Sequence, residues 1–252
     1  MTRVQFAPIS SAVAGAVAVT VLGGVAAYWH QWWLPAVGWL AALSYLLISN
    51  ALLLRGLRQR HTTRFGPANV VTAVRSTLVG VISGIVVASF VAPIPVGLLL
   101  ALVVPALLLD AVDGWVARRT KSASELGARF DMEVDAFLLL VLSAYVSQTL
   151  GIWVLAIGVM RYAFVVAGWI FPWLRRQLPF RYWRKVVTAV QGVALTIAGT
   201  GFLPVLDVLL VAIALALLLE SFGRDLVWLG ARRTEPESLP GGLPSYSAHG
   251  ES

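Results

Sequence analysis

Four aspartates lie within 26 residues of a chain that is otherwise almost entirely apolar: Asp110, Asp113, Asp131 and Asp135. An acidic side chain inside a bilayer costs about 2.5–3.5 kcal/mol even on the scale with the smallest penalty, so such residues usually have a function. No lysine or arginine is interleaved closely enough in the sequence to neutralise each of them. A divalent cation would supply the missing charge, and hard carboxylate oxygens suit Mg²⁺ or Mn²⁺, which also bind phosphate groups.

The spacing of the aspartates places them in two facing pairs. Asp110 and Asp113 are three residues apart, and Asp131 and Asp135 are four apart. Each pair therefore shares one face if its segment is helical. The alternative is that the acids simply pair at a membrane edge with the basic residues near them, namely Arg118, Arg119, Lys121 and Arg129. That alternative does not explain the facing pairs or the glycines between them.

Small and basic residues between the two pairs complete a longer pattern. Gly114 and Ala117 continue the first face with almost no side chain, which leaves room for a ligand, and Arg118 adds a guanidinium suited to phosphate. Together with Gly127 and the aspartates they form D-x2-D-G-x2-A-R-x8-G-x3-D-x3-D. Every fixed position is present, and in this the chain resembles the CDP-alcohol phosphatidyltransferases, which carry this signature.

Two weaker segments extend the resemblance over roughly residues 65–225. Residues 67–75, Pro-Ala-Asn-Val-Val-Thr-Ala-Val-Arg, look like the motif that opens the first core helix of such enzymes. Residues 185–191 are similar to a segment often seen in their fifth core helix. The chain also departs from the family, because many relatives have a basic residue after the last aspartate, whereas Ala136 and Phe137 follow Asp135 here. This departure weakens any inference about the acceptor.

The resemblance implies a reaction and its site. Such enzymes transfer a phosphatidyl group from CDP-diacylglycerol to an alcohol, release CMP, and use Mg²⁺ or Mn²⁺, expected here as two ions. The resemblance makes the four aspartates the metal ligands and Asp135 also the base that deprotonates the acceptor hydroxyl. It assigns the lining of the cytidine diphosphate pocket to Gly114, Ala117, Arg118 and Gly127. It also suggests a homodimer.

Other polar residues are candidates for binding substrates. Asn69 and Thr72 could face the nucleotide, although helix capping explains Asn69 equally well. Arg75 and Lys185 are candidates for the acceptor, and snorkelling towards the membrane surface is the alternative for Arg75. Arg161 lies about ten residues into an apolar stretch, where it would neutralise the aspartates, bind an acceptor phosphate or form a structural ion pair.

The composition is that of an integral membrane protein. Of the 252 residues, 59% are hydrophobic and 12% charged, and the mean hydropathy is +0.83. No cysteine is present, which excludes a disulfide or a thiolate site. Eight apolar stretches are long enough to span a bilayer, at residues 9–29, 33–54, 69–92, 95–117, 128–150, 152–174, 186–202 and 204–222. We therefore expect an all-α protein of about eight transmembrane helices, with an N-terminal two-helix hairpin before a six-helix catalytic core.

Basic residues alternate along the connections between these stretches. Lysine and arginine are absent at 30–32, 92–95, 150–152 and 199–204, whereas the other connections and the segment after the last stretch are rich in arginine. The positive-inside rule therefore places both termini and the aspartates on the cytoplasmic side. The net charge of +7 then indicates cytoplasmic loops and anionic lipid rather than nucleic acid. An arginine-, alanine- and valine-rich composition suggests a GC-rich genome. We expect the protein in the bacterial cell membrane.

Three regions are expected along the chain. Residues 1–60 would form the hairpin and a basic linker, residues 61–230 the catalytic membrane domain, and residues 231–252, rich in Pro, Gly, Ser and Glu, a disordered cytoplasmic tail. Residues 1–28 could instead be a signal peptide. Their apolar run exceeds the usual length, however, and a second apolar stretch follows at once, which favours a retained helix.

Two other classes of function compete with transfer. A metal-ion or proton transporter could use intramembrane acids, but transporters usually place them near the bilayer midplane on broken helices. A non-catalytic lipid-binding relative would be expected to have lost a metal ligand first. The expected partners are thus CDP-diacylglycerol, membrane lipids and an alcohol acceptor. The acceptor itself is left open among glycerol phosphate, inositol phosphate, serine and phosphatidylglycerol.

Overall fold

The computed structural model describes residues 34–59, 67–120, 125–175 and 182–231, and within these ranges every regular element is helical. The helices are α2 (Ala36–Gln59), α3 (Pro67–Ala88), α4 (Val96–Thr120), α5 (Glu125–Leu150), α6 (Leu155–Ile170), α7 (Tyr182–Ala198) and α8 (Pro204–Ala231), with short 3₁₀ turns η1 (Ile152–Val154) and η2 (Pro172–Arg175). The all-α prediction is confirmed. The count of eight helices is not, because the expected span at 9–29 lies outside the described residues, as do residues 232–252 of the expected tail.

Among the described residues, three helical stretches are long and apolar enough to cross a bilayer: Ala36–Leu53, Ile152–Ile170 and Pro204–Ala231. Shorter apolar stretches occupy Val74–Ala88 in α3 and Val96–Ala111 in α4. The apolar stretch of α4 ends one residue past Asp110, and the first half of α5 carries acidic and basic residues. The helices that supply the candidate site are therefore the ones whose apolar stretches are interrupted.

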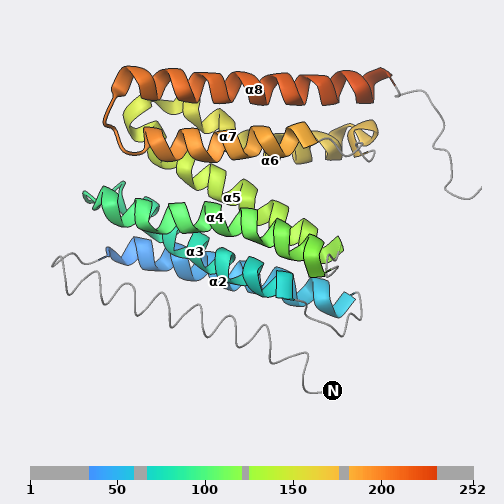
Figure 1. Cartoon of the computed structure of the whole chain (residues 1–252), viewed down its shortest axis with the longest axis horizontal. Coiled ribbons are helices and arrows are strands. Elements are labelled where there is room, and N and C mark those ends of the chain that lie inside the picture. Colours follow the sequence, from blue (N-terminus) through green and yellow to red (C-terminus); the bar gives the residue numbers. More distant parts are fainter. Residues whose placement is uncertain (1–33, 60–66, 121–124, 176–181, 232–252) are drawn as a thin grey trace, which may run out of the picture.

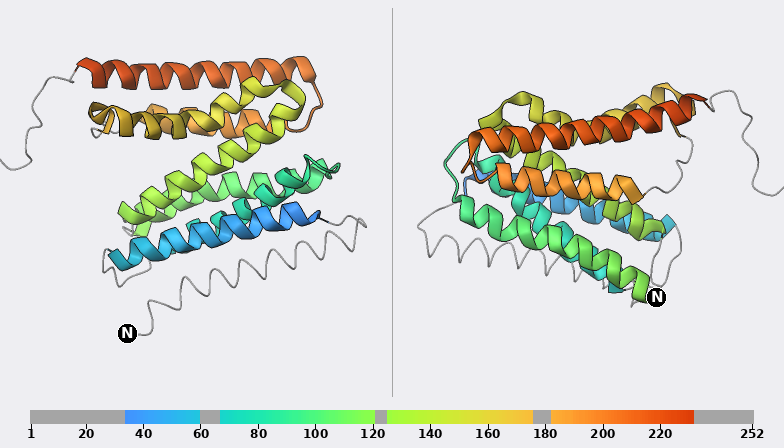
Figure 2. Two further views of the ribbon diagram at one scale, coloured as in Figure 1. Left: turned by 180° about the vertical axis from the view of Figure 1, so that it is seen from behind. Right: turned by 45° about the horizontal axis from the view of Figure 1, so that its top comes forward.

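The helices form two groups with α5 running obliquely between them (Figure 1). On one side lie α2, α3 and α4, and on the other α6, α7 and α8; the views in Figure 2 show the same arrangement. Helix α3 packs against α2, α4 and α5, while α5 also contacts α6 and α7, and α7 packs on α8. The buried core runs through this junction and includes Ile82, Leu142 and Leu195.

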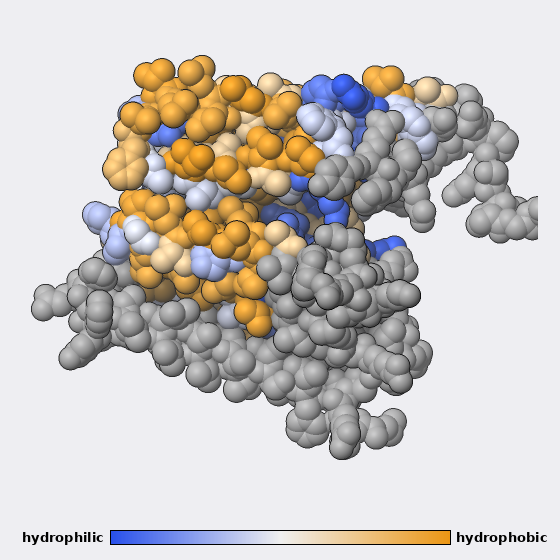
Figure 3. Space-filling view, viewed as in Figure 1, coloured by the Kyte–Doolittle hydropathy of each residue, from blue (hydrophilic) through white to orange (hydrophobic). Residues whose placement is uncertain are grey.

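The outer surface of the bundle is apolar, as a lipid-facing surface must be. Large apolar side chains such as Leu47, Ile213 and Val227 are mostly exposed on α2 and α8. Figure 3 shows apolar residues over most of the described face, with hydrophilic residues gathered towards the end where α8 stops. One end of the bundle is therefore polar, and it is the end to which the charged residues of the candidate site belong.

Small residues allow the helices to approach closely, as is common in membranes. Gly158 of α6 is buried against α5, where an added Cβ would lie 2.5 Å from the Ser143 hydroxyl oxygen and would also meet the backbone at Leu140. At the turn from α5 into η1, Gly151 has φ of 100°, a conformation that favours glycine. Both glycines fix how α6 returns along α5.

Candidate active site

Three carboxylates converge where α4 meets α5. Asp110 comes from α4, and Asp131 and Asp135 from one face of α5, as their spacing of four residues predicts. One oxygen from each side chain lies within 4.8 Å of the others. The side chains are partly exposed, at 46%, 31% and 26% respectively. The cluster is thus open on one side, and the side chain of Asp113 lies outside the described residues.

A single arginine of α3 contacts all three carboxylates from their buried side. Arg75 has no exposed side-chain surface, and its Nη1 lies 2.5 Å from Asp110 Oδ1. Its Nη2 lies 3.0 Å from Asp135 Oδ1, pairs with the Asp131 carboxylate, and donates to the Asp131 carbonyl oxygen at 3.3 Å. Arg75 was expected among the acceptor-binding candidates, whereas the structure places it against the aspartates.

The charges of this cluster suit a divalent ion. Three carboxylates surround a single guanidinium, so acidic groups outnumber the basic group that contacts them in the described part of the site. Each contact with Arg75 uses one carboxylate oxygen, so the second oxygen of each aspartate lies outside these contacts. Because Arg75 covers only the buried side, a cation can approach from the exposed side. Oxygen donors of this kind and number fit Mg²⁺ or Mn²⁺.

Two further basic residues lie near the cluster. The exposed Lys185, in the first turns of α7, is close enough for its charge to act on Asp135. Arg161 of α6 donates through Nη2 to Glu133 Oε1 at 2.5 Å. Arg161 therefore pairs with Glu133, which lies between Asp131 and Asp135 in the sequence but off the helix face that they share.

The structure describes only part of the expected nucleotide pocket. Gly127 lies half-buried in the first turn of α5. The remaining candidates belong to α3 and α4, but their side chains lie outside the described residues: Asn69, Thr72, Gly114, Ala117 and Arg118. Their placement on the two helices that also carry Arg75 and Asp110 is consistent with a shared site.

A second polar cluster, which the sequence analysis did not identify, ties α7 to α8. Arg184 Nη2 lies 2.9 Å from Oδ1 of the buried Asp225, and the Trp183 indole donates to Glu220 at 3.2 Å. Acids near the end of the last apolar stretch were the available signal in the sequence. This cluster fixes the helix that carries Lys185.

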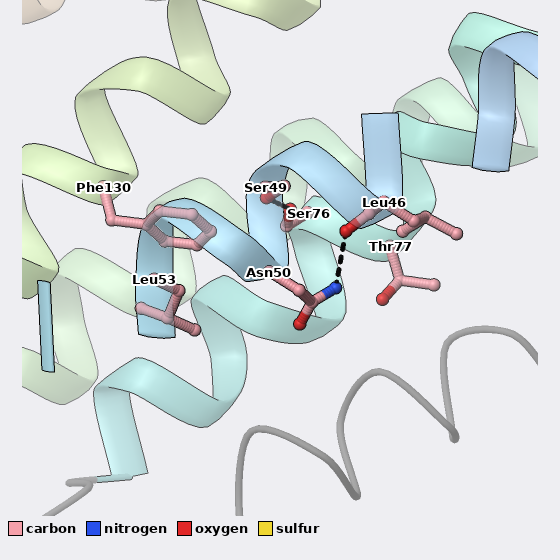
Figure 4. Close-up of a pocket in the computed structure, with 7 residues that line it drawn as sticks. All are labelled: Leu46, Ser49, Asn50, Leu53, Ser76, Thr77 and Phe130. Carbon is pink, nitrogen blue, oxygen red and sulfur yellow. Dashed lines mark hydrogen bonds between the residues drawn. The ribbon is translucent and has the colours of Figure 1, made fainter. Parts of the chain in front are cut away.

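A small polar hollow lies between α2, α3 and α5 (Figure 4). Its lining consists of Leu46, Ser49, Asn50, Leu53, Ser76, Thr77 and Phe130. It has room for about one water molecule, so it cannot be the substrate pocket. Ser49 and Ser76 share a buried hydrogen bond of 2.8 Å across it.

Comparison with known families agrees with this geometry. The family model for CDP-alcohol phosphatidyltransferases matches residues 65–220, more than half of the chain. The chain therefore belongs to the CDP-alcohol phosphatidyltransferase family, whose members act in phosphatidyl transfer during phospholipid synthesis. No curated protein and no solved structure matched the chain. The matched region contains Arg75 and all four aspartates and leaves α2 outside.

Proposed function

We propose that this protein transfers a phosphatidyl group from CDP-diacylglycerol to an alcohol and releases CMP, on the cytoplasmic side of the membrane. The observation that carries the proposal is the convergence of Asp110, Asp131 and Asp135 over the buried Arg75 within a chain of this family. A transporter is less well supported, because α4 and α5 run as continuous helices through the cluster, whereas transporters usually bind ions on broken helices.

All four aspartates would bind metal ions, and one of them would also act as the base. Asp110, Asp113, Asp131 and Asp135 would hold one or two Mg²⁺ or Mn²⁺ ions. Such ions, when bound, neutralise the pyrophosphate and stabilise the leaving phosphate oxygen. Arg75 holds the carboxylates together from the buried side, which keeps their open side directed at the substrate. The nucleotide would be bound by Arg118 and by the small residues of the signature.

Asp135 would be the base. The acceptor oxygen forms a bond to the phosphorus of the phosphatidyl group, while the bond between that phosphorus and the bridging oxygen of CMP breaks. The acceptor proton passes to Asp135, and CMP leaves with the bridging oxygen. Asp135 is the least exposed of the three described carboxylates, and Lys185 acts on its charge from α7. Positioning of the acceptor hydroxyl beside this carboxylate supplies much of the rate.

The test uses purified protein, labelled CDP-diacylglycerol and either Mg²⁺ or Mn²⁺. Glycerol phosphate, inositol phosphate, serine and phosphatidylglycerol are offered separately as acceptors. We expect one acceptor to give CMP and a new phospholipid in equal amounts, and a chelator to stop both. Absence of CMP with every acceptor, together with metal-ion flux into proteoliposomes, would replace this proposal with the transporter.

A further inference from the structure

Helix α2 lies outside the matched family region, yet it packs closely on the helix that carries Arg75. An added Cβ on Gly38 of α2 would lie 2.7 Å from the Gly84 carbonyl oxygen of α3, and one on Gly84 would lie 2.6 Å from the Gly38 carbonyl oxygen. An added Cβ on Gly80, one turn closer to Arg75, would lie 3.1 Å from the ring of Tyr45. The two backbones therefore lie in close contact at Gly38 and Gly84, and side chains of α2 fill the space at Gly80.

Hydrogen bonds also join α2 to α3 at the residue next to Arg75. Ser49 of α2 and Ser76 of α3 are both buried and share a hydrogen bond of 2.8 Å (Figure 4). The Tyr45 hydroxyl group lies 3.4 Å from the same Ser76 oxygen. Because Ser76 follows Arg75 directly in the sequence, these bonds restrain the backbone from which the arginine side chain leaves α3.

Tyr45 also contacts the helix that carries two of the aspartates. Its ring stacks on Phe137 of α5, with ring centroids 4.4 Å apart and planes inclined by 20°. Phe137 lies two residues beyond Asp135, and the charges of both Arg75 and Asp135 act on the Tyr45 hydroxyl group. One side chain of α2 thus bridges α3 and α5 at the point where their charged residues meet.

We propose that α2 contributes to the active site through two positioning residues, Tyr45 and Ser49, which hold Arg75 in contact with Asp135. This inference rests on the proposed function of the carboxylate cluster. A misplacement of about 1 Å at such a site can cost on the order of a hundredfold in rate, so a brace of this kind would control kcat more than substrate binding.

The test compares Tyr45→Leu, Tyr45→Phe and Ser49→Ala in the full-length protein. Tyr145→Leu is the control for lost packing, because Tyr145 is also half-buried but lies on α5. Ser83→Ala is the control for the serine, because the Ser83 hydroxyl donates to the Gly80 carbonyl oxygen within α3. Measurements are kcat, the KM for CDP-diacylglycerol, and the Mn²⁺-induced rise in melting temperature, all on monodisperse protein.

We expect Tyr45→Leu to lower kcat at least about tenfold, with KM changed less than about threefold, and Tyr45→Phe to restore most of the loss. Ser49→Ala should lower kcat about threefold to tenfold, because it removes one buried hydrogen bond. If Tyr45→Leu does not fold, Ser49→Ala is the variant that tests the proposal. A kcat in Tyr45→Leu, or in Ser49→Ala, equal to that of its control would overturn the proposal.

The Mn²⁺ response separates this proposal from the proposed function. If the wild type transfers to no acceptor but is stabilised by Mn²⁺, the proposal of phosphatidyl transfer is wrong. The role of α2 is then tested by the Mn²⁺-induced rise in melting temperature of the variants alone. A smaller Mn²⁺ response in Tyr45→Leu than in Tyr145→Leu then supports the brace, and equal responses overturn it. A wild type that neither transfers nor responds to Mn²⁺ overturns both.

Discussion

The buried guanidinium of Arg75 answers the charge problem that acids create in membrane helices. Isolated carboxylates in an apolar surrounding are costly unless they are paired and hydrogen-bonded. Arg75 contacts three of them at once, and its planar fork suits several carboxylates better than a lysine would. The cluster can therefore be stable before any substrate arrives, and its remaining negative charge is directed to the exposed side.

Arg75→Met should destabilise the metal-free protein by about 2–4 kcal/mol, because three carboxylates would lose their cation. The loss should be smaller in Mn²⁺ than in a chelator, since a bound cation can replace part of the missing charge. Thermal unfolding under both conditions measures this. Arg224→Met, which removes an exposed arginine paired with Glu220 on α8, is the control and should cost less than about 1 kcal/mol. Equal losses of Arg75→Met with and without metal would contradict the argument.

Asp135→Asn should abolish most turnover while CDP-diacylglycerol still binds. The amide cannot accept the acceptor proton, and a general base typically contributes about 10²–10⁴-fold to the rate. Release of CMP measures turnover, and equilibrium binding of labelled CDP-diacylglycerol measures the retained affinity. Asp207→Asn, which alters a buried acid in the first turn of α8, serves as the control. Near-normal turnover in Asp135→Asn would remove the assigned base.

Arg161→Ala tests whether the acceptor carries a phosphate group. Charge-assisted hydrogen bonds are worth about 1.5–3 kcal/mol, so the KM for a phosphorylated acceptor should rise roughly tenfold to a hundredfold, with little change for CDP-diacylglycerol. Glu133→Gln, which removes the described partner of Arg161, should not raise the acceptor KM. Activity with serine or inositol alone, and none with phosphorylated acceptors or phosphatidylglycerol, would show that Arg161 has only a structural ion pair.

The convergence of Asp110, Asp131 and Asp135 could be predicted from the sequence, and their counter-ion could not. The spacing of Asp131 and Asp135 is local, so helical periodicity alone places them on one face. Arg75 stands 56 residues before Asp131, and only the packing of α3 on α5 brings them together. The ion pair between Glu133 of α5 and Arg161 of α6 likewise depends on the packing of the two helices, which no local pattern in the sequence reveals.

At the scale of the elements, the apolar stretches located the helices better than they located their ends. The expected span at 186–202 is the helix α7, which begins at Tyr182, and the span at 204–222 is α8, which continues to Ala231. Hydropathy ends where charged residues begin, but the helical backbone does not. The extra turns carry Arg184 and Asp225, whose ion pair joins α7 to α8 at this end.

The close contact between α2 and α3 at Gly38 and Gly84 can be tested by substitution. Gly84→Ala would place a Cβ against the Gly38 carbonyl oxygen, a backbone atom that cannot rotate away, so we expect a loss of about 1–3 kcal/mol and lower kcat. Gly223→Ala, where an added Cβ in α8 meets nothing within 4 Å, should be neutral or stabilising by up to about 1 kcal/mol. Thermal unfolding and CMP release compare them. Equal stability of the two variants would show that the α2–α3 contact can relax.

At the scale of the whole molecule, the site lies where the two groups of helices meet. Arg75 and Asp110 come from the group of α2, α3 and α4, Lys185 from the group of α6, α7 and α8, and Asp135 from α5 between them (Figure 1). A relative movement of the two groups would therefore change the distance between Lys185 and the carboxylates. This arrangement suits an enzyme that must bind the polar headgroup of a lipid substrate at one polar end of the bundle.

The orientation of the molecule can be tested because the chain contains no cysteine. Helix α8 has 28 residues, so it is about 42 Å long and exceeds the roughly 30 Å apolar core of a bilayer. Phe202→Cys lies in the exposed turn before this helix, which lacks lysine and arginine, and Gly230→Cys lies at its exposed far end. The positive-inside rule predicts that a membrane-impermeant maleimide labels Phe202→Cys in intact cells, but Gly230→Cys only after permeabilisation. Labelling of Gly230→Cys from outside would reverse the orientation and place the carboxylate cluster away from cytoplasmic nucleotides.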